Sequence, residues 1–238
     1  MNPVRVAVAA VLLGVVMSGC GGSGGPTAAT STSTASPAAP AFSDYQALRS
    51  GRTYTTTAFR PSIRFTLPPG TWSSEVGDTA TDFTVAVHDP PGGMAQALLA
   101  AHRVQQVYDP QNGGRIPGDR VPLRGSFADW LQRHPRLRVT APRPARLMGL
   151  SGVQMDVSGR SQPPRVPEEC SKTGSDCVPL FYDGFDPVTY ARSNRGRFIV
   201  LKLPSGGELV IEQFVEPAAE FSDGLRLLRP LLQRLQLT

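Results

Sequence analysis

Apolar and polar residues alternate along several short segments of this chain, and a period of two is typical of β-strands with one buried face. In the segments 82–88 (DFTVAVH) and 153–159 (VQMDVSG), every second residue is apolar, as with Phe83, Val85 and Val87 in the first. Successive strand residues point to opposite sides of a sheet. The pattern therefore favours a sheet built from many strands over a helical bundle.

A β-hairpin is predicted near the end of the chain. The apolar segments 198–203 (FIVLKL) and 208–215 (ELVIEQFV) are separated by residues 204–207 (PSGG), which are turn-forming types. We expect two antiparallel strands joined by this four-residue loop. Another strand is expected at 63–67 (IRFTL), and the stretch 97–108 (ALLAAHRVQQVY) is compatible with either a strand or a helix.

Two segments show helical patterning instead. Ser126 and Asp129 form a capping box at the start of SFADWLQRH, which Pro135 ends. Near the C-terminus apolar residues recur every three or four positions, at Phe221, Leu225, Leu228, Leu232 and Leu235. Pro230 is expected to bend or divide this second helix. The combined pattern predicts an α+β fold, an antiparallel sheet with the mid-chain helix and the C-terminal helix packed on one face.

The first twenty residues have the features of an export signal. Arg5 precedes an apolar run at 6–16, which is too short to span a bilayer as a helix. The following residues 17–20 (MSGC) resemble the lipobox of bacterial envelope lipoproteins, whose cysteine receives a diacylglyceryl group before the signal peptide is cut. The resemblance implies that residues 1–19 are removed and that Cys20 bears acyl chains such as palmitate. An ordinary signal peptide with an idle Cys20 is the alternative.

The lipobox resemblance implies a location at the outer face of the cytoplasmic membrane, anchored by diacylglyceryl and N-acyl chains. Residues 20–43 are expected to form the lipidated cysteine and a flexible linker, since 21–41 contains no charge and no aromatic residue. Residues 44–238 are expected to form one globular domain, for which the 40% apolar content of the 238-residue chain is sufficient.

The predicted order of strands and helices resembles the PsbP-like α+β fold of actinobacterial envelope lipoproteins. This resemblance implies an architecture and a binding or assembly role, and it assigns no residue. With Cys20 given to the lipid, Cys170 and Cys177 remain as an even pair in an oxidising compartment, which favours a disulfide. Their spacing is not that of a redox pair, and zinc needs about four ligands.

No catalytic, cofactor-binding or metal-binding residue is predicted. The histidines His88, His102 and His134 have no metal-site spacing, and the adjacent strand residues His88 and Asp89 point to opposite faces. His134 is expected at a helix end, where a cation is favoured. Ser151 is expected in a turn before a strand, without the second glycine of a nucleophile elbow.

Acidic and basic residues each gather in one stretch. Carboxylates at Glu168, Glu169, Asp176, Asp183 and Asp186 are expected to be solvated loop acids, with a calcium site as the alternative. The net charge is +5 and the pI about 9.5, yet nucleic acid is not the expected partner of an exported protein. The basic residues within Arg133–Arg146 favour either a solvated face or contact with anionic head groups.

We therefore expect a non-enzymatic, lipid-anchored interaction or accessory module of the cell envelope, whose partner is an unknown envelope protein or a small ligand. The alternative is a carrier or sensor that holds a small or hydrophobic ligand beneath the C-terminal helix. A hydrolase with a non-standard site is the third hypothesis. A cleft that gathers His88 or His102 with a carboxylate and a hydroxyl is the arrangement that such an enzyme requires.

Overall fold

The computed structural model describes residues 46–88, 95–110, 120–160, 177–184 and 186–238. They belong to a folded unit that spans Ala38–Thr238. The predicted signal peptide, Cys20 and most of the predicted linker lie outside the described residues. The same is true of Asp89, Glu168, Glu169, Cys170 and Asp176.

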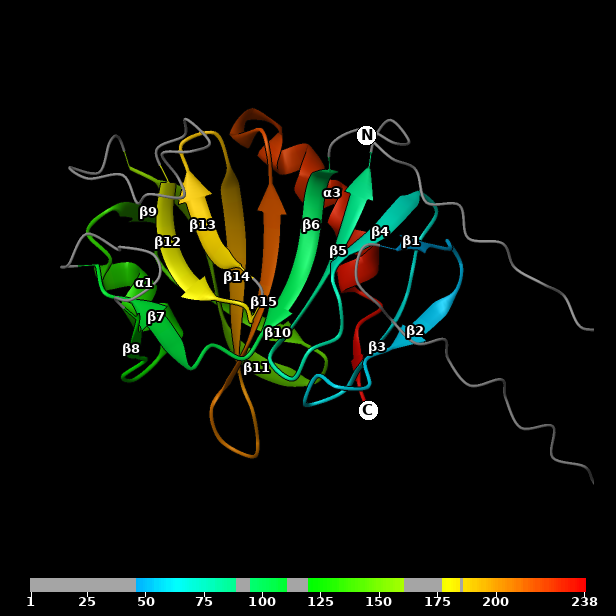
Figure 1. Cartoon of the computed structure of the whole chain (residues 1–238), viewed down its shortest axis with the longest axis horizontal. Helices are drawn as coiled ribbons and strands as arrows, with labels where there is room; N and C mark the ends of the chain where they lie inside the picture. Colours follow the sequence, from blue (N-terminus) through cyan, green and yellow to red (C-terminus); the bar gives the residue numbers. More distant parts are fainter. Residues whose placement is uncertain (1–45, 89–94, 111–119, 161–176, 185) are drawn as a thin grey trace, which may run out of the picture. The chain divides into compact units, whose positions relative to one another are not determined.

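A large antiparallel sheet forms the centre of the unit (Figure 1). All of its strand pairs are antiparallel, and β9 pairs with β11 beside the main path. The strands follow one another across the sheet in the order β1 (Ala47–Leu48), β4 (Thr71–Val76), β5 (Asp82–His88), β6 (Ala95–His102), β15 (Glu208–Val215), β14 (Arg195–Lys202), β11 (Leu150–Gly159) and β10 (Arg143–Leu147), with β9 at Leu137–Val139.

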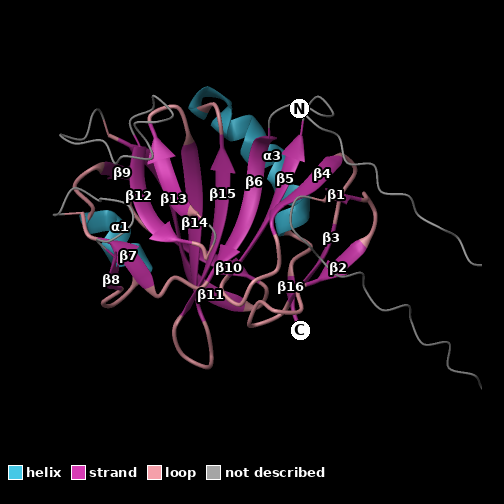
Figure 2. Ribbon diagram, viewed as in Figure 1, coloured by secondary structure: helices cyan, strands magenta, loops and turns pink. Residues whose placement is uncertain are grey.

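Three small sheets and two α-helices complete the described fold, which is α+β and mainly β (Figure 2). The small sheets are β12 (Cys177–Tyr182) with β13 (Pro187–Ala191), β16 (Gln236–Leu237) with β3 (Ile63–Thr66) and β2 (Thr53–Thr55), and β7 (Gln106–Tyr108) with β8 (Arg120–Pro122). The helices are α1 (Phe127–Arg133) and α3 (Phe221–Leu232), the latter preceded by the 3-10 turn η1 (Ala218–Glu220).

The strands that alternation predicts are confirmed. The segments at 82–88 and 153–159 lie in β5 and β11, and the predicted hairpin is β14–β15. Lys202 pairs with Glu208, and within the loop the Leu203 amide donates a hydrogen bond to the Gly207 carbonyl. The ambiguous stretch 97–108 forms strands β6 and β7. β6 is bonded to β5 on one side and to β15 on the other, so sheet pairing decides its structure.

The central sheet buries both of its faces, in two separate apolar cores. Ile199 and Leu201 of β14 pack into the core that α3 covers. Their neighbours Phe198 and Val200 pack into a second core with α1 and the β12–β13 hairpin. The two helices therefore lie on opposite faces, and the prediction that both cover one face is wrong. The apolar residues of α1 pack instead against the sheet face opposite α3.

Both helix predictions hold in their main features and differ in detail. α1 begins after Ser126, whose Oγ accepts a hydrogen bond from the Ala128 amide. The carboxylate next to this cap comes from Glu208 of β15, which accepts hydrogen bonds from the Ser126 hydroxyl and the Phe127 amide. α3 runs through Pro230 without being divided and ends two residues later. The apolar residues predicted for its buried face pack into the first core.

Candidate functional site

A pocket of about 180 Å³ lies between the central sheet and the β12–β13 hairpin. Leu98 and Ala100 of β6 line it, whereas their neighbours Leu99 and Ala101 belong to the core under α3. Because strand residues alternate between faces, the pocket lies on the face opposite α3. This pocket is thus on the other side of the sheet from the space beneath the C-terminal helix in which the carrier hypothesis expects a ligand.

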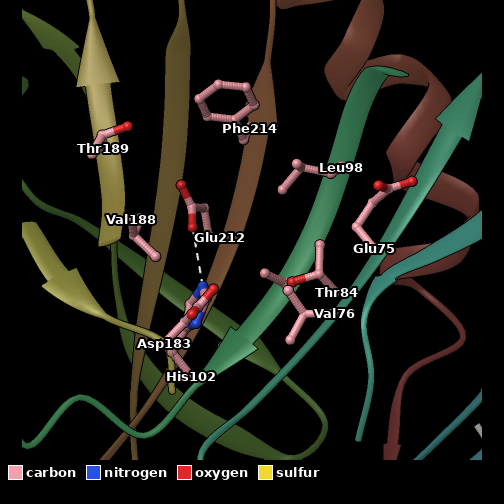
Figure 3. A pocket seen from close by; sticks show the side chains of 11 residues that line it. Glu75, Val76, Thr84, Leu98, His102, Asp183, Val188, Thr189, Glu212 and Phe214 are labelled. Atoms are coloured by element: carbon pink, nitrogen blue, oxygen red, sulfur yellow. Dashed lines mark hydrogen bonds and ion pairs between the residues drawn. The ribbon is translucent and has the colours of Figure 1, made fainter. Parts of the chain in front are cut away.

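The pocket walls are largely apolar, and Glu212, His102 and Asp183 lie together at one end (Figure 3). Val76, Leu98, Val188 and Phe214 provide apolar surface from both layers. Figure 3 shows Glu212, His102 and Asp183 side by side, with Leu98, Val76 and Thr84 across from them and Glu75 farther along the same side. Such a combination of apolar walls and a few convergent polar groups is typical of small-molecule sites.

A buried chain of hydrogen bonds runs behind the polar end of the pocket. His102 Nδ1 lies 2.6 Å from Asp82 Oδ1, and its Nε2 lies 3.0 Å from Glu212 Oε2. The Tyr190 hydroxyl donates to Glu212 Oε1 across 2.6 Å. All four side chains are buried, with exposed fractions of 3% or less. A single hydrogen-bond network therefore connects residues of β5, β6, β13 and β15.

Strand register explains why these residues meet. Asp82 of β5 is the cross-strand partner of His102 in β6, so their side chains stand beside each other on one face. On the other side of β6, His102 pairs with Val210 of β15, and Glu212 lies two residues farther along the same face. Diagonal neighbours of this kind are within reach of long side chains. The cluster depends on the pairing of strands that are far apart in the sequence.

His102 is a cation in this environment. Burial works to lower the pKa of His102, but the hydrogen bonds and negative charges of Asp82 and Glu212 outweigh it and raise the pKa to about 10. Burial, together with the charge and hydrogen bond of Glu212, raises the pKa of Tyr190 well above its usual value. Tyr190 therefore remains a neutral donor to Glu212. The hydrogen-bonded cluster thus consists of the His102 imidazolium between the carboxylates of Asp82 and Glu212, with the Tyr190 phenol bonded to Glu212.

His88, which the hydrolase hypothesis names, lies near Glu75 at the edge of this pocket. Ser73 Oγ is 2.6 Å from His88 Nε2 and donates to Glu75 Oε1 across 2.5 Å. Glu75 Oε1 itself lies 3.6 Å from His88 Nε2. In a catalytic triad the carboxylate binds the ring nitrogen on the side away from the hydroxyl. Here Glu75 and Ser73 share the Nε2 side, so the three residues do not have triad geometry.

Two other sequence-predicted positions are corrected. His134 does cap the C-terminal end of α1, but it is buried. Burial and the charges of Arg136 and Arg160 lower the pKa of His134 to about 3, so it is neutral and the expected cation is absent. Ser151 is the second residue of β11, because the turn expected to contain it lies earlier, at Met148-Gly149. The Ser151 side chain is exposed.

One of the predicted loop acids lies at the pocket, whereas two arginines of the basic stretch lie on an edge strand. Asp183 lines the pocket, and its Oδ1 accepts a hydrogen bond from the Asp186 amide. Arg143 and Arg146 are exposed on β10, the last strand of the main sheet path. Arginine and Pro144 on an edge strand hinder pairing with another chain. For Arg143 and Arg146, this placement fits a solvated face.

Within the described ranges, no group of three or more His, Cys, Asp or Glu side chains is arranged to hold a metal ion. Nor does any described helix reach the length and apolarity that crossing a membrane requires. Cys177 is described as the first, buried residue of β12. Its pairing with Cys170, and the lipidation of Cys20, stay predictions because both of those cysteines lie outside the described residues.

Sequence analysis predicts no binding residue in this region, and no motif marks Asp82, Tyr190 or Glu212. One signal was present in β15, where Glu212 shares a strand face with Val210 and Phe214. A carboxylate within an apolar strand face requires a buried partner, which points to a polar cluster without saying where it lies.

Comparison with known proteins gives little that bears on this site. No protein-family model matches the chain, and no curated protein matches it. Among solved structures, one similar chain is LpqN, described as involved in cell envelope biogenesis of Mycobacterium tuberculosis. The two share 12% identity over 82% of this chain and 91% of that one, with a TM-score of 0.28. At that TM-score the similarity supports no conclusion about function.

Proposed function

We propose that this protein is a lipid-anchored, extracytoplasmic binding protein of the bacterial cell envelope that holds a small ligand in the pocket beside β12–β13. The observation that carries the ligand-binding role is the pocket itself, with apolar walls from two layers and a charged, buried end. The anchoring rests on the lipobox resemblance at Cys20. The pocket moves the carrier hypothesis ahead of the general interaction module.

The size of the pocket limits the ligand. Drug-sized molecules occupy cavities of roughly 300–1,000 Å³, whereas this pocket measures about 180 Å³. A cavity of about 150 Å³ in another protein is known to hold benzene. We therefore propose a ligand, or a terminal group of a larger ligand, of about the size of one six-membered ring.

Binding is proposed in place of catalysis because of the state of His102. A general base must be unprotonated and must reach the proton that it abstracts. His102 is held as a cation, and both of its ring nitrogens are directed at carboxylates. His88 is near a hydroxyl and a carboxylate without triad geometry. The pocket thus has charge and shape for recognition, and its central imidazole is not available as a base.

A protein-docking role through a large apolar patch has less support. Among the described residues, the exposed large apolar side chains are Val121 and Tyr182, with exposed fractions of 37% and 39%. Interaction patches on soluble proteins usually cover several hundred Å² of contiguous apolar surface. These two side chains alone provide much less than that.

The ligand-binding role is tested by native mass spectrometry of the full chain isolated from membranes of its own cells. Leu98→Trp fills the pocket, and Leu147→Trp makes the same change at another half-buried strand leucine, on β10 and outside the pocket lining. We expect a small-molecule adduct on the wild type and on Leu147→Trp, and its loss from Leu98→Trp. Equal adduct occupancy in all three proteins would contradict the proposal.

A further inference from the structure

The pocket that we propose as the ligand site carries an excess of negative charge. Its described lining includes three carboxylates, from Glu75, Asp183 and Glu212, and a single cationic group, His102. No described lysine or arginine lines it. Three formal negative charges are thus opposed by one positive charge, and a fourth carboxylate, Asp82, contacts the far side of His102.

The imidazole and phenol donors at the charged end of the pocket are already engaged. The two ring nitrogens of His102 face Asp82 and Glu212, and the Tyr190 hydroxyl donates to Glu212. An anionic ligand would therefore meet carboxylate oxygens without gaining a donor from these groups. Carboxylates accept up to about four hydrogen bonds each, so this end of the pocket has more acceptor than donor capacity.

Burial makes this imbalance costly. The exposed fractions are 3% for Glu212, 7% for Asp183 and 2% for Asp82. Asp82, which contacts His102 from outside the pocket lining, has a buried Oδ2 without a hydrogen-bond partner among the described residues. Charges removed from water are stable only when paired and hydrogen-bonded, and unpaired buried polar atoms are rare in proteins. A cation that enters the pocket relieves the negative excess.

We infer that the ligand of this pocket is a small organic cation, a protonated amine on an apolar body of about the size of one ring; this inference rests on the proposed binding function. The ammonium group lies against Glu212 and Asp183, and the body packs on Leu98 and Phe214 (Figure 3). The apolar walls fit an organic ion better than a bare metal ion.

Three probes of one shape test the inference on the purified full chain in detergent: benzylammonium, benzyl alcohol and benzoate. Binding is followed by NMR of the methyl groups of Leu98 and Val188, which line the pocket. We expect benzylammonium to bind at least about tenfold more tightly than benzyl alcohol, because hydrogen bonds to charged groups are the strong ones. Benzoate is expected not to bind, since it brings a further negative charge.

Two charge-removing variants test whether the pocket carboxylates are responsible for the affinity for benzylammonium. Glu75→Gln changes a side chain that is one-third exposed, so the fold is retained. Glu212→Gln removes the buried charge, and its fold is verified from the methyl spectrum before titration. We expect a loss of benzylammonium affinity of about twofold to fivefold for Glu75→Gln and of about tenfold for Glu212→Gln.

The outcomes distinguish this inference from the binding function on which it rests. If benzyl alcohol binds as tightly as benzylammonium, or benzoate binds best, the cationic ligand is wrong and a ligand pocket is still supported. If no probe shifts the pocket methyl groups, both proposals are overturned. If benzylammonium binds equally to Leu98→Trp, its site is elsewhere and the inference fails. Preference for benzylammonium that is lost in Leu98→Trp and kept in Leu147→Trp supports both.

Discussion

The hydroxyl of Tyr190 occupies the space that a side chain at position 196 would need. A Cβ built on Gly196 would lie 1.7 Å from the Tyr190 oxygen and 2.6 Å from the ring carbon that bears it. Since the same hydroxyl donates to Glu212 Oε1, the missing side chain at Gly196 is what lets Tyr190 reach the pocket carboxylate. A glycine in β14 thereby determines the hydrogen bonding of a residue in β15.

Gly196→Ala is expected to destabilise the protein by about 2–4 kcal/mol, because it combines overpacking with the loss of a hydrogen bond to a charged group. Tyr190→Phe removes only the hydroxyl and should cost about 1.5–3 kcal/mol. The free energy of unfolding from urea titration measures both. We expect Gly196→Ala to cost less in the Tyr190→Phe background, since part of the clash is gone. Full additivity of the two changes would contradict the contact.

Stability should fall on the alkaline side because of His102. The pKa of this imidazole is about 6.5 in the unfolded chain and about 10 in the folded protein. Its contribution to the free energy of unfolding is therefore complete below pH 6.5 and is lost as the pH rises through 10. The slope in that window should approach about 1.4 kcal/mol per pH unit.

The measurement is urea unfolding of the full chain between pH 6 and pH 10.5, together with NMR of the His102 ring protons. Those protons should not titrate below about pH 9. Tyr190→Phe serves as the control because it removes the ionisation of the neighbouring phenol, whose raised pKa acts in the same direction. An unfolding free energy that stays constant from pH 7 to pH 10 would refute the assignment of a cation at this position.

His134 should cause the opposite dependence on the acid side. Its folded-state pKa of about 3 lies below the unfolded value of about 6.5. The stabilising contribution is present above pH 6.5 and is lost as the pH falls through 3, because the unfolded chain binds the proton more readily. His134→Gln removes this term while leaving the carboxylates. Relative to that variant, the wild type should lose stability between pH 6.5 and pH 3, and parallel pH profiles would count against the prediction.

The sequence predicts those parts of the fold that depend on local pattern. The period of two in 82–88 and 208–215 predicts β5 and β15, and the spacing of apolar residues from Phe221 predicts α3. The side of the sheet on which α1 packs is not local information. It depends on which face α3 leaves free, and this becomes known only when β14 places Phe198 and Ile199 on opposite cores.

The candidate site cannot be predicted from local sequence patterns, for a related reason. His102 and Glu212 are 110 residues apart, and their contact exists because β6 pairs with β15 in one particular register. A shift of one residue in that register would turn Glu212 to the other face. The histidine was visible as a candidate, but its two carboxylates belong to different strands. Their partnership follows from tertiary pairing, which period and spacing do not encode.

The predicted Cys170–Cys177 disulfide can be tested through the two cysteines separately. If they are paired, Cys170→Ser and Cys177→Ser should each lower the free energy of unfolding by at least about 2–3 kcal/mol, the loop-closure contribution of so short a loop. Treatment of the wild type with a reductant should reproduce that loss, and alkylation before reduction should leave both thiols unlabelled. Alkylation of the wild type without reductant would contradict the pairing.

The predicted acylation of Cys20 determines whether the protein is held at the membrane. A lipoprotein cysteine carries two or three acyl chains, and two are enough for stable anchoring at about 0.8 kcal/mol for each buried CH₂. No described helix offers a membrane span as a substitute. Cys20→Ala should therefore move the chain from the membrane fraction to the soluble extracytoplasmic fraction and abolish labelling by radioactive palmitate. Cys177→Ser, which also removes one thiol, should retain both label and membrane association. If Cys20→Ala fractionated with membranes like the wild type, the proposed location would have to rest on some other contact.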